Sequence, residues 1–197
     1  MNKFLFILAA MLIATAAIAE NEIGMYMVEN PTPESAEEDA CYSGAPGQFT
    51  AYVVLTGPVN DGLGTPIENV GGFEFQLIWP AGPFVTPAIH PSATNFMTAP
   101  DFFCGANIPV VGGQCTLITV TIGVFTADPV LWSLAPVSDE NAQSIPGAIA
   151  ITDADDNFEI SQAYPVSGDF SEPIFGMWTC VVPNDDVSFG GVKALFQ

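Results

Sequence analysis

Residues 152–160, TDADDNFEI, hold three aspartates, an asparagine and a glutamate within nine consecutive positions. Four of these side chains, those of Asp153, Asp155, Asn157 and Glu159, stand on alternate residues. Hard divalent cations such as Ca²⁺ bind carboxylate and carbonyl oxygens that flexible loops supply. The segment is therefore a candidate calcium site formed by these four residues, and the alternative is an acidic turn exposed to water.

The spacing is similar to the first half of an EF-hand calcium loop, but the second half departs from that pattern. Phe158 stands at the position of the turn glycine, and Tyr164 stands where the bidentate glutamate belongs. Only a calcium site of another kind, built on a β-rich fold, is compatible with the sequence. The acidic turn remains the simpler interpretation.

The residue types of this chain give little support for a catalytic site. His90 is the only histidine and lies in the loop-like stretch AIHPSA, so a nucleophile with an adjacent histidine base is not expected. Glycoside hydrolysis needs only two carboxylates at a fixed separation, and the chain has 22 acidic residues. No pair stands out, so we expect no catalytic residues and no enzyme.

The three tryptophans are the candidates for an aromatic platform that binds sugar rings. Trp132 and Trp178 lie inside apolar segments and are expected in the core. Trp79 ends such a segment, immediately before Pro80, and is expected to be exposed. Trp79 is therefore the candidate ligand-binding residue.

The charge balance limits the partners of the chain. Its 22 acidic residues face two basic ones, Lys3 and Lys193, and the formal net charge is −20 at pH 7. Nucleic acids and anionic membranes are excluded, because nothing neutralises their phosphates. The partners expected are a protein or a polysaccharide at the cell surface, with self-assembly as a further alternative.

The N-terminal residues predict export. Residues 1–19 contain one lysine, then an apolar run that closes on Ala17-Ile18-Ala19, which is typical of a cleaved secretory signal peptide. We expect the protein to be secreted or extracellular, with the periplasm as an alternative. Residues 20–197 are then expected to form a single domain.

Export makes disulfides the expected state of the four cysteines. Cys41, Cys104, Cys115 and Cys180 allow three connectivities. Cys104 and Cys115 bracket GANIPVVGGQ, whose proline and paired glycines could turn the chain back on itself. We therefore favour a local Cys104–Cys115 disulfide and a long-range Cys41–Cys180 disulfide.

The segments between turns favour strands over helices. Phe73, Phe75 and Leu77 alternate with polar residues, which is the period of a half-buried strand. Val, Ile, Thr and Phe dominate the apolar segments, and no stretch has helical spacing. The sequence predicts an all-β fold, a single immunoglobulin-like or jelly-roll-like β-sandwich of about seven to nine strands. Residues 80–114 are expected to form a long excursion from it.

Two resemblances accompany this pattern. The segment containing Gly72, Phe73, Phe75 and Leu77 resembles an early strand of cohesin-type domains, with Trp79-Pro80 where those domains commonly have Tyr-Asp. This resemblance implies a sandwich fold similar to cohesin-type and carbohydrate-binding domains. The ends of the expected mature chain, IGMY at 23–26 and GVKALF at 191–196, resemble uncharacterised secreted bacterial proteins, which implies no activity.

Taken together, these features predict a secreted, non-catalytic structural or binding module at the cell exterior, with a role in adhesion, matrix or scaffolding. The first alternative is a carbohydrate-binding module that uses Trp79. The second is a secreted glycoside hydrolase.

Overall fold

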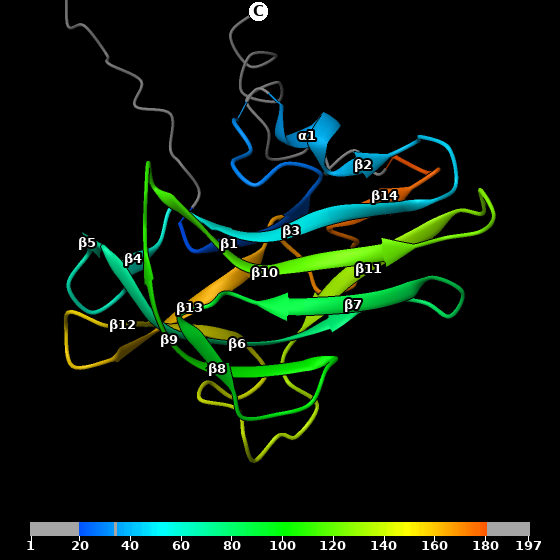
Figure 1. The fold of residues 1–197 in the computed structure, drawn as a ribbon. Coiled ribbons are helices and arrows are strands. Elements are labelled where there is room, and N and C mark those ends of the chain that lie inside the picture. The colour runs from blue at the N-terminus through cyan, green and yellow to red at the C-terminus, as the bar shows by residue number, and fades with distance from the viewer. Residues whose placement is uncertain (1–19, 34, 181–197) are drawn as a thin grey trace, which may run out of the picture.

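The computed structural model describes residues 20–33 and 35–180 (Figure 1). The expected signal peptide, residues 1–19, and the tail that contains GVKALFQ lie outside the described residues. No helix in the described part of the chain is long and apolar enough to cross a membrane.

The described residues form 14 strands and one short helix, so the all-β prediction is confirmed. The predicted number of strands was lower, because short strands such as those of two residues leave no periodic pattern in a sequence. In chain order the elements are β1 (Glu22–Tyr26), α1 (Ala36–Asp39), β2 (Cys41–Tyr42), β3 (Gln48–Thr56), β4 (Val59–Asn60), β5 (Thr65–Pro66), β6 (Asn69–Ile78), β7 (Phe84–Ile89), β8 (Ala93–Asn95), β9 (Asp101–Pro109), β10 (Gln114–Gly123), β11 (Val130–Ala135), β12 (Ile149–Asp153), β13 (Glu159–Pro165) and β14 (Phe175–Met177).

Twelve of the strands belong to one mixed sheet, in the order β2-β14-β11-β6-β12-β13-β1-β3-β10-β7, with β9 also paired to β6 and β8 to β9. The pairs β1–β13 and β14–β2 are parallel. The strands β4 and β5 form a separate ribbon. The two separate sheets of the predicted immunoglobulin-like or jelly-roll-like sandwich are not confirmed, because hydrogen bonding through β13 and β1 joins all the large strands. Residues 80–114 are no irregular excursion, since β7, β8 and β9 place most of them in the sheet.

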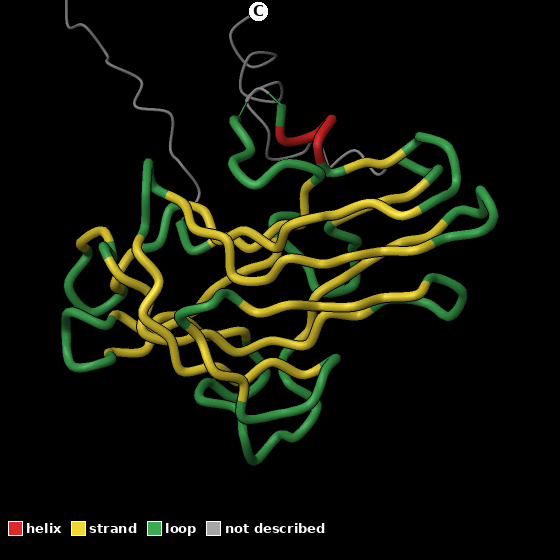
Figure 2. The backbone as a smooth tube through the Cα atoms, in the orientation of Figure 1, coloured by secondary structure: helices red, strands yellow, loops and turns green. Residues whose placement is uncertain are grey.

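The sheet encloses a single main core, to which both halves of the strand order contribute. On β6, Phe73, Phe75 and Leu77 are buried, as their alternation predicts. They belong to the same cluster as Leu55 of β3 and Ile118 of β10, which lie near the other end of the strand order. Figure 2 shows the long strands running side by side, with most loops gathered at the two ends of the molecule. Side chains presented by these loops are therefore the candidates for function.

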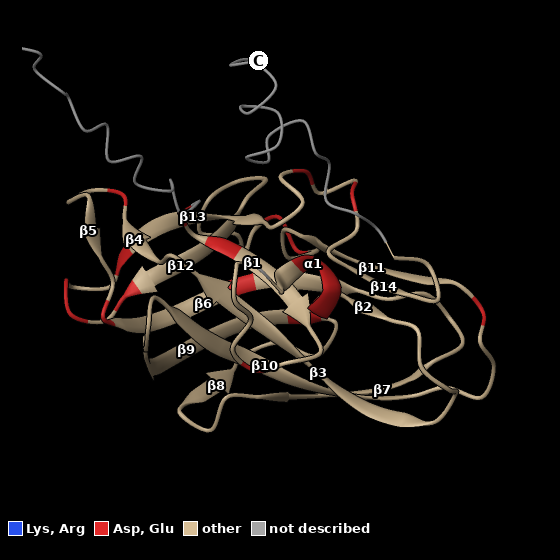
Figure 3. Ribbon diagram, turned by 90° about the horizontal axis from the view of Figure 1, so that it is seen from above, with Lys and Arg blue, Asp and Glu red and all other residues tan. Residues whose placement is uncertain are grey.

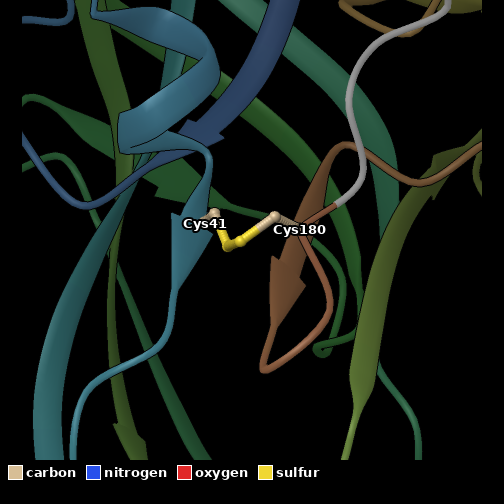
Figure 4. The surroundings of a disulfide bond; sticks show 2 residues. All are labelled: Cys41 and Cys180. Carbon is tan, nitrogen blue, oxygen red and sulfur yellow. A yellow bond between two sulfur atoms is a disulfide. The ribbon is translucent and has the colours of Figure 1, made fainter.

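One of the two predicted disulfides is confirmed. Cys41 of β2 and Cys180, which follows β14, are bonded across a sequence separation of 139 residues (Figure 4). The bond joins two chain segments that also pair in parallel, since Gly176 lies opposite Cys41. A structural disulfide of this kind is typical of an oxidising extracellular or periplasmic compartment.

The predicted Cys104–Cys115 disulfide is wrong, because both cysteines are free and buried. Gly112 and Gly113, both with positive φ, do turn the chain, but β9 and β10 then diverge to different neighbours. Cys104 pairs with Phe73 of β6, whereas Cys115 pairs with Leu55 of β3. Burial raises the pKa of both thiols to about 12, so they remain protonated and pack as small apolar side chains.

Acidic residues lie mainly on loops and on α1, and the described residues include no lysine or arginine (Figure 3). Carboxylates in this part of the chain therefore accept hydrogen bonds from neutral donors or face water. A carboxyl group that is also buried loses its contact with water, and this favours its protonated form. Desolvation raises the pKa of Glu22 at the start of β1 from 4.5 to about 7.

Removal of the disulfide should destabilise the fold strongly. In the chain-entropy model, a link across 139 residues stabilises by about 5 kcal/mol. The double variant Cys41→Ser/Cys180→Ser should lose free energy of unfolding of that order in urea titrations. Wild-type protein treated with a reductant is the matched control and should behave like the variant. A loss too small to measure would contradict a structural role for the bond.

The pH dependence of stability should carry a contribution from Glu22. The pKa of Glu22 is higher in the folded protein than in the unfolded chain. Between pH 4.5 and about 7, Glu22 therefore binds a proton in the folded protein that it does not hold in the unfolded chain. Its contribution to stability is therefore greatest below pH 4.5 and declines as the pH rises to about 7. Glu22→Gln should remove this decline in urea titrations at pH 5 and pH 8, whereas the exposed control Glu68→Gln should retain it. Equal pH profiles for wild type and Glu22→Gln would exclude the assignment.

Candidate functional site

The acidic segment forms the turn between β12 and β13. Asp153 is the last residue of β12 and lies directly opposite Glu159, the first residue of β13. Between them, Asn157 and Phe158 have φ values of 49° and 57°, in the left-handed region. Alternate residues share one side only while a strand stays extended, so the reversal separates the four predicted ligands.

The structure brings together only part of the predicted set. Asp153 is buried, and its carboxylate accepts hydrogen bonds from Asn60 Nδ2, at 3.1 Å, and from the Asp155 amide, at 3.0 Å. Asn60 Nδ2 also donates to the carboxylate of Asp156, at 3.3 Å. The Asp155 carboxylate instead accepts from Asn69 Nδ2 at 2.8 Å.

Glu159 completes a group of three neighbouring carboxyl groups with Asp153 and Asp156. A hydrogen bond with Asp156, then desolvation and the negative charges of Asp156 and Asp153, raise the pKa of Glu159. The turn after β4 lies against it, since a Cβ added at Gly62 would overlap the Glu159 carboxylate. Sequence reasoning missed Asp156 and Asn60, because Asn60 lies 93 residues from Asp153 and gives no local signal.

Asn60 gives this group a neutral hydrogen-bond donor. Its side-chain oxygen accepts from the amides of Gly62, at 3.0 Å, and Leu63, at 3.1 Å. The opposite end of the amide, Nδ2, is thereby directed at Asp153 and Asp156. Among the described residues, no group of three or more His, Cys, Asp or Glu side chains is arranged to hold a metal ion. The calcium site at Asp153, Asp155, Asn157 and Glu159 stays a prediction.

Neutralising Glu159 should relieve repulsion within the turn. We expect Glu159→Gln to melt at a higher temperature than wild type at pH 8 in EDTA, and the difference to shrink as the pH falls and Glu159 takes up a proton. Glu172→Gln, an exposed acid in the loop between β13 and β14, is the control. A lower melting temperature for Glu159→Gln would contradict the repulsion.

The same melting experiment tests calcium. If Ca²⁺ binds at the turn, it raises the melting temperature of wild type and does so less for Glu159→Gln. Equal melting of wild type in EDTA and in Ca²⁺ would exclude the calcium site.

Trp79, the predicted ligand-binding residue, is half-buried after the end of β6. Its ring packs against the fully buried Trp132, with ring centroids 5.8 Å apart. Trp178 is also half-buried; its Nε1 donates to the Gly44 carbonyl at 2.9 Å. Neither indole stands free as a platform, and both extend the core toward the loops.

Two phenylalanines are far more exposed than these tryptophans. Phe84, the first residue of β7, is 68% exposed, and Phe125, just after β10, is 81% exposed. Their rings meet edge to face, with centroids 5.7 Å apart. Both residues lie at or just beyond strand ends, close to Gly or Pro residues, and sequence reasoning did not single them out.

A groove of about 410 Å³ opens beside this pair, and we call it the loop-end groove. It is lined by Pro46, Gly47, Gln48, Phe84, Gly123, Val124 and Phe125. A smaller hollow of about 200 Å³ adjoins it, shares Val124 and Phe125, and reaches Asp128 and Trp178. Phe125 therefore stands between two hollows at one end of the molecule.

His90 shows no arrangement for catalysis. Its Nδ1 accepts a hydrogen bond from the backbone amide of Ser92 at 3.1 Å, within the turn between β7 and β8. The imidazole therefore stabilises a local turn.

No family model matches the chain, and no curated protein matches it. Among solved structures, a DUF4466 family protein from Parabacteroides merdae ATCC 43184 is similar at 7% sequence identity and a TM-score of 0.22. The match covers 74% of this chain and 46% of that one, so the chain spans less than half of that protein. The cohesin-like resemblance is not confirmed, and no fold or function is inferred from the structural likeness.

Proposed function

We propose that the protein is a non-catalytic binding module that acts at the cell exterior, in adhesion, in a matrix or as a scaffold. The observation that carries the proposal is the exposed pair Phe84–Phe125 on the loop-end groove. Large aromatic side chains exposed together at a groove are typical of interaction sites. The Cys41–Cys180 disulfide supports an exterior location.

The charge distribution supports the loop-end groove as the contact surface. The protein is strongly acidic, yet no residue that lines this groove is charged. In the adjoining hollow, Asp128 accepts a hydrogen bond from Thr126 Oγ1 at 2.6 Å. A partner can cover such a surface without removing unpaired charges from water. This suits a protein surface, a sugar surface or a second copy of the chain.

The non-catalytic part of the proposal is supported by the carboxyl geometry. Retaining glycoside hydrolases hold two carboxyl groups about 5 Å apart, and inverting ones hold them farther apart. Asp156 and Glu159, which interact directly, are in hydrogen-bond contact instead. They also lie on a turn away from the loop-end groove.

Carbohydrate binding is the second candidate, and the Phe84–Phe125 pair favours it over the half-buried Trp79. Edge-to-face packing leaves ring surface exposed, and sugar rings present apolar faces that can stack on it. Gln48 and Thr126 lie in the two hollows and could supply hydrogen bonds to sugar hydroxyls.

The test compares wild type, Phe84→Ala, Phe125→Ala and the control Val111→Ala, which removes an exposed side chain outside both hollows. Self-association is measured by sedimentation, and carbohydrate binding by retention on insoluble polysaccharides. We expect one of these activities in wild type and in the control, and a loss of about tenfold in affinity for Phe125→Ala. The proposal would be overturned if the double variant Phe84→Ala/Phe125→Ala bound as tightly as wild type. It would also be overturned if wild type showed no binding in either assay.

A further inference from the structure

The outward side of β6 carries a second groove, which we call the outer-face groove. Phe73 and Phe75 point into the core, so Gly72 and Glu74 lie on the opposite side of the strand. Strand register sets two cross-strand rows there, Gly105–Gly72–Thr152 and Phe103–Glu74–Ala150. Small side chains in these rows leave a hollow of about 170 Å³.

Aromatic rings line this hollow, and glycines make room for them. Phe96, 68% exposed, lies over Gly105, where an added Cβ would be 3.3 Å from its ring. Phe158, 57% exposed, lies over Gly71, where an added Cβ would be 2.6 Å from its ring. Phe158 holds a φ of 57°, which is unfavourable for a bulky residue and is more common at functional sites. The two rings come from different loops and flank the same floor.

Glu74 supplies a negative group at this hollow, and it is only 4% exposed. One carboxylate oxygen accepts from the Ser144 amide at 2.7 Å, and the other accepts from Ser144 Oγ at 2.6 Å. Each carboxylate oxygen can accept two hydrogen bonds, so one acceptor position remains on each. No lysine or arginine in the described residues is present to pair with Glu74.

We propose that the outer-face groove binds an alkylammonium group, either a free amine or a lysine side chain. The ammonium would donate to the open acceptor positions of Glu74, and the phenylalanine faces would attract its charge and its methylene groups. The net charge of −20 raises the local concentration of cations at such a site.

The lining also distinguishes an alkylammonium from other ligands. A metal ion would need several oxygen ligands, and the hollow is lined mostly by apolar groups around one carboxylate. A neutral sugar or alcohol would leave the charge of Glu74 unpaired. The groove lies on β6, β9 and β12 and shares no residue with the loop-end groove, so the two proposals fail or succeed separately.

The test follows the backbone amide signals of Gly72 and Gly105 by NMR while n-butylammonium or the neutral n-butanol is added. We expect saturable shifts with the amine and none with the alcohol. Glu74→Gln should weaken amine binding about tenfold, which corresponds to about 1.4 kcal/mol. Glu68→Gln, an acid outside the groove, should bind as wild type does.

Two further arms complete the experiment. Phe96→Ala removes an exposed ring, so this variant should fold and should bind the amine more weakly than wild type. It tests the groove even if Glu74→Gln does not fold. A Gly-Lys-Gly peptide compared with the free amine shows which source of the ammonium group binds better. Three results would overturn the proposal. They are equal shifts with the alcohol and the amine, no saturable shift in a folded sample, and unchanged amine affinity in both Glu74→Gln and Phe96→Ala.

Discussion

The constraint on which the structure depends is electrostatic: the described chain has many carboxylates and no lysine or arginine to pair with them. Carboxylates at loops therefore accept hydrogen bonds from neutral amides and hydroxyls. The same arrangement occurs twice in the loop between β11 and β12. Ser138 donates its amide and Oγ to Asp101, at 2.8 and 2.7 Å, as Ser144 donates to Glu74. These two serines attach the loop to the outward side of β9 and β6.

The start of the described chain is held by a similar network. The carboxylate of Asp61 accepts from Asn21 Nδ2, at 3.2 Å, and from the Gln162 amide, at 2.8 Å. Asn21 Oδ1 in turn accepts from the Val59 amide at 2.6 Å. This network joins the segment before β1 to β4 and β13, beside the parallel pair that makes the sheet continuous. Neutral donors thus hold carboxylates where basic side chains would do so in a salt bridge, and Ser144 attaches one loop of the outer-face groove to the sheet in this way.

Features with a local cause could be predicted from the sequence. Alternation of Phe73, Phe75 and Leu77 predicts a strand with one buried side, and β6 is that strand. An export signal and four cysteines predicted disulfides but not their pairing: Cys41–Cys180 was the pair left once Cys104 and Cys115 were assigned to each other, and only the long-range bond is present. The local disulfide failed, because a turn at Gly112 and Gly113 indicates a reversal but says nothing about which neighbours the two strands choose.

The candidate sites were less predictable, because they depend on residues distant in sequence. The acidic turn was located correctly, but its partner Asn60 lies in another hairpin. Nothing in the sequence marks Gly71 and Gly105 as part of a site, whereas in the structure they give room to aromatic rings. Exposure of Phe84 and Phe125 depends on where β7 and β10 end, and strand ends are the least predictable feature of a sequence.

The most direct test of the electrostatic account is the salt dependence of stability. Free energy of unfolding is measured by urea titration at pH 7.5 while NaCl rises from about 0.02 to about 0.3 M, a range that shortens the screening length several-fold. Because repulsion among carboxylates dominates and neutral hydrogen bonds are little screened, stability should rise with salt. A fall in stability with salt would contradict the account, since it would mean that attractive ion pairs hold the fold together.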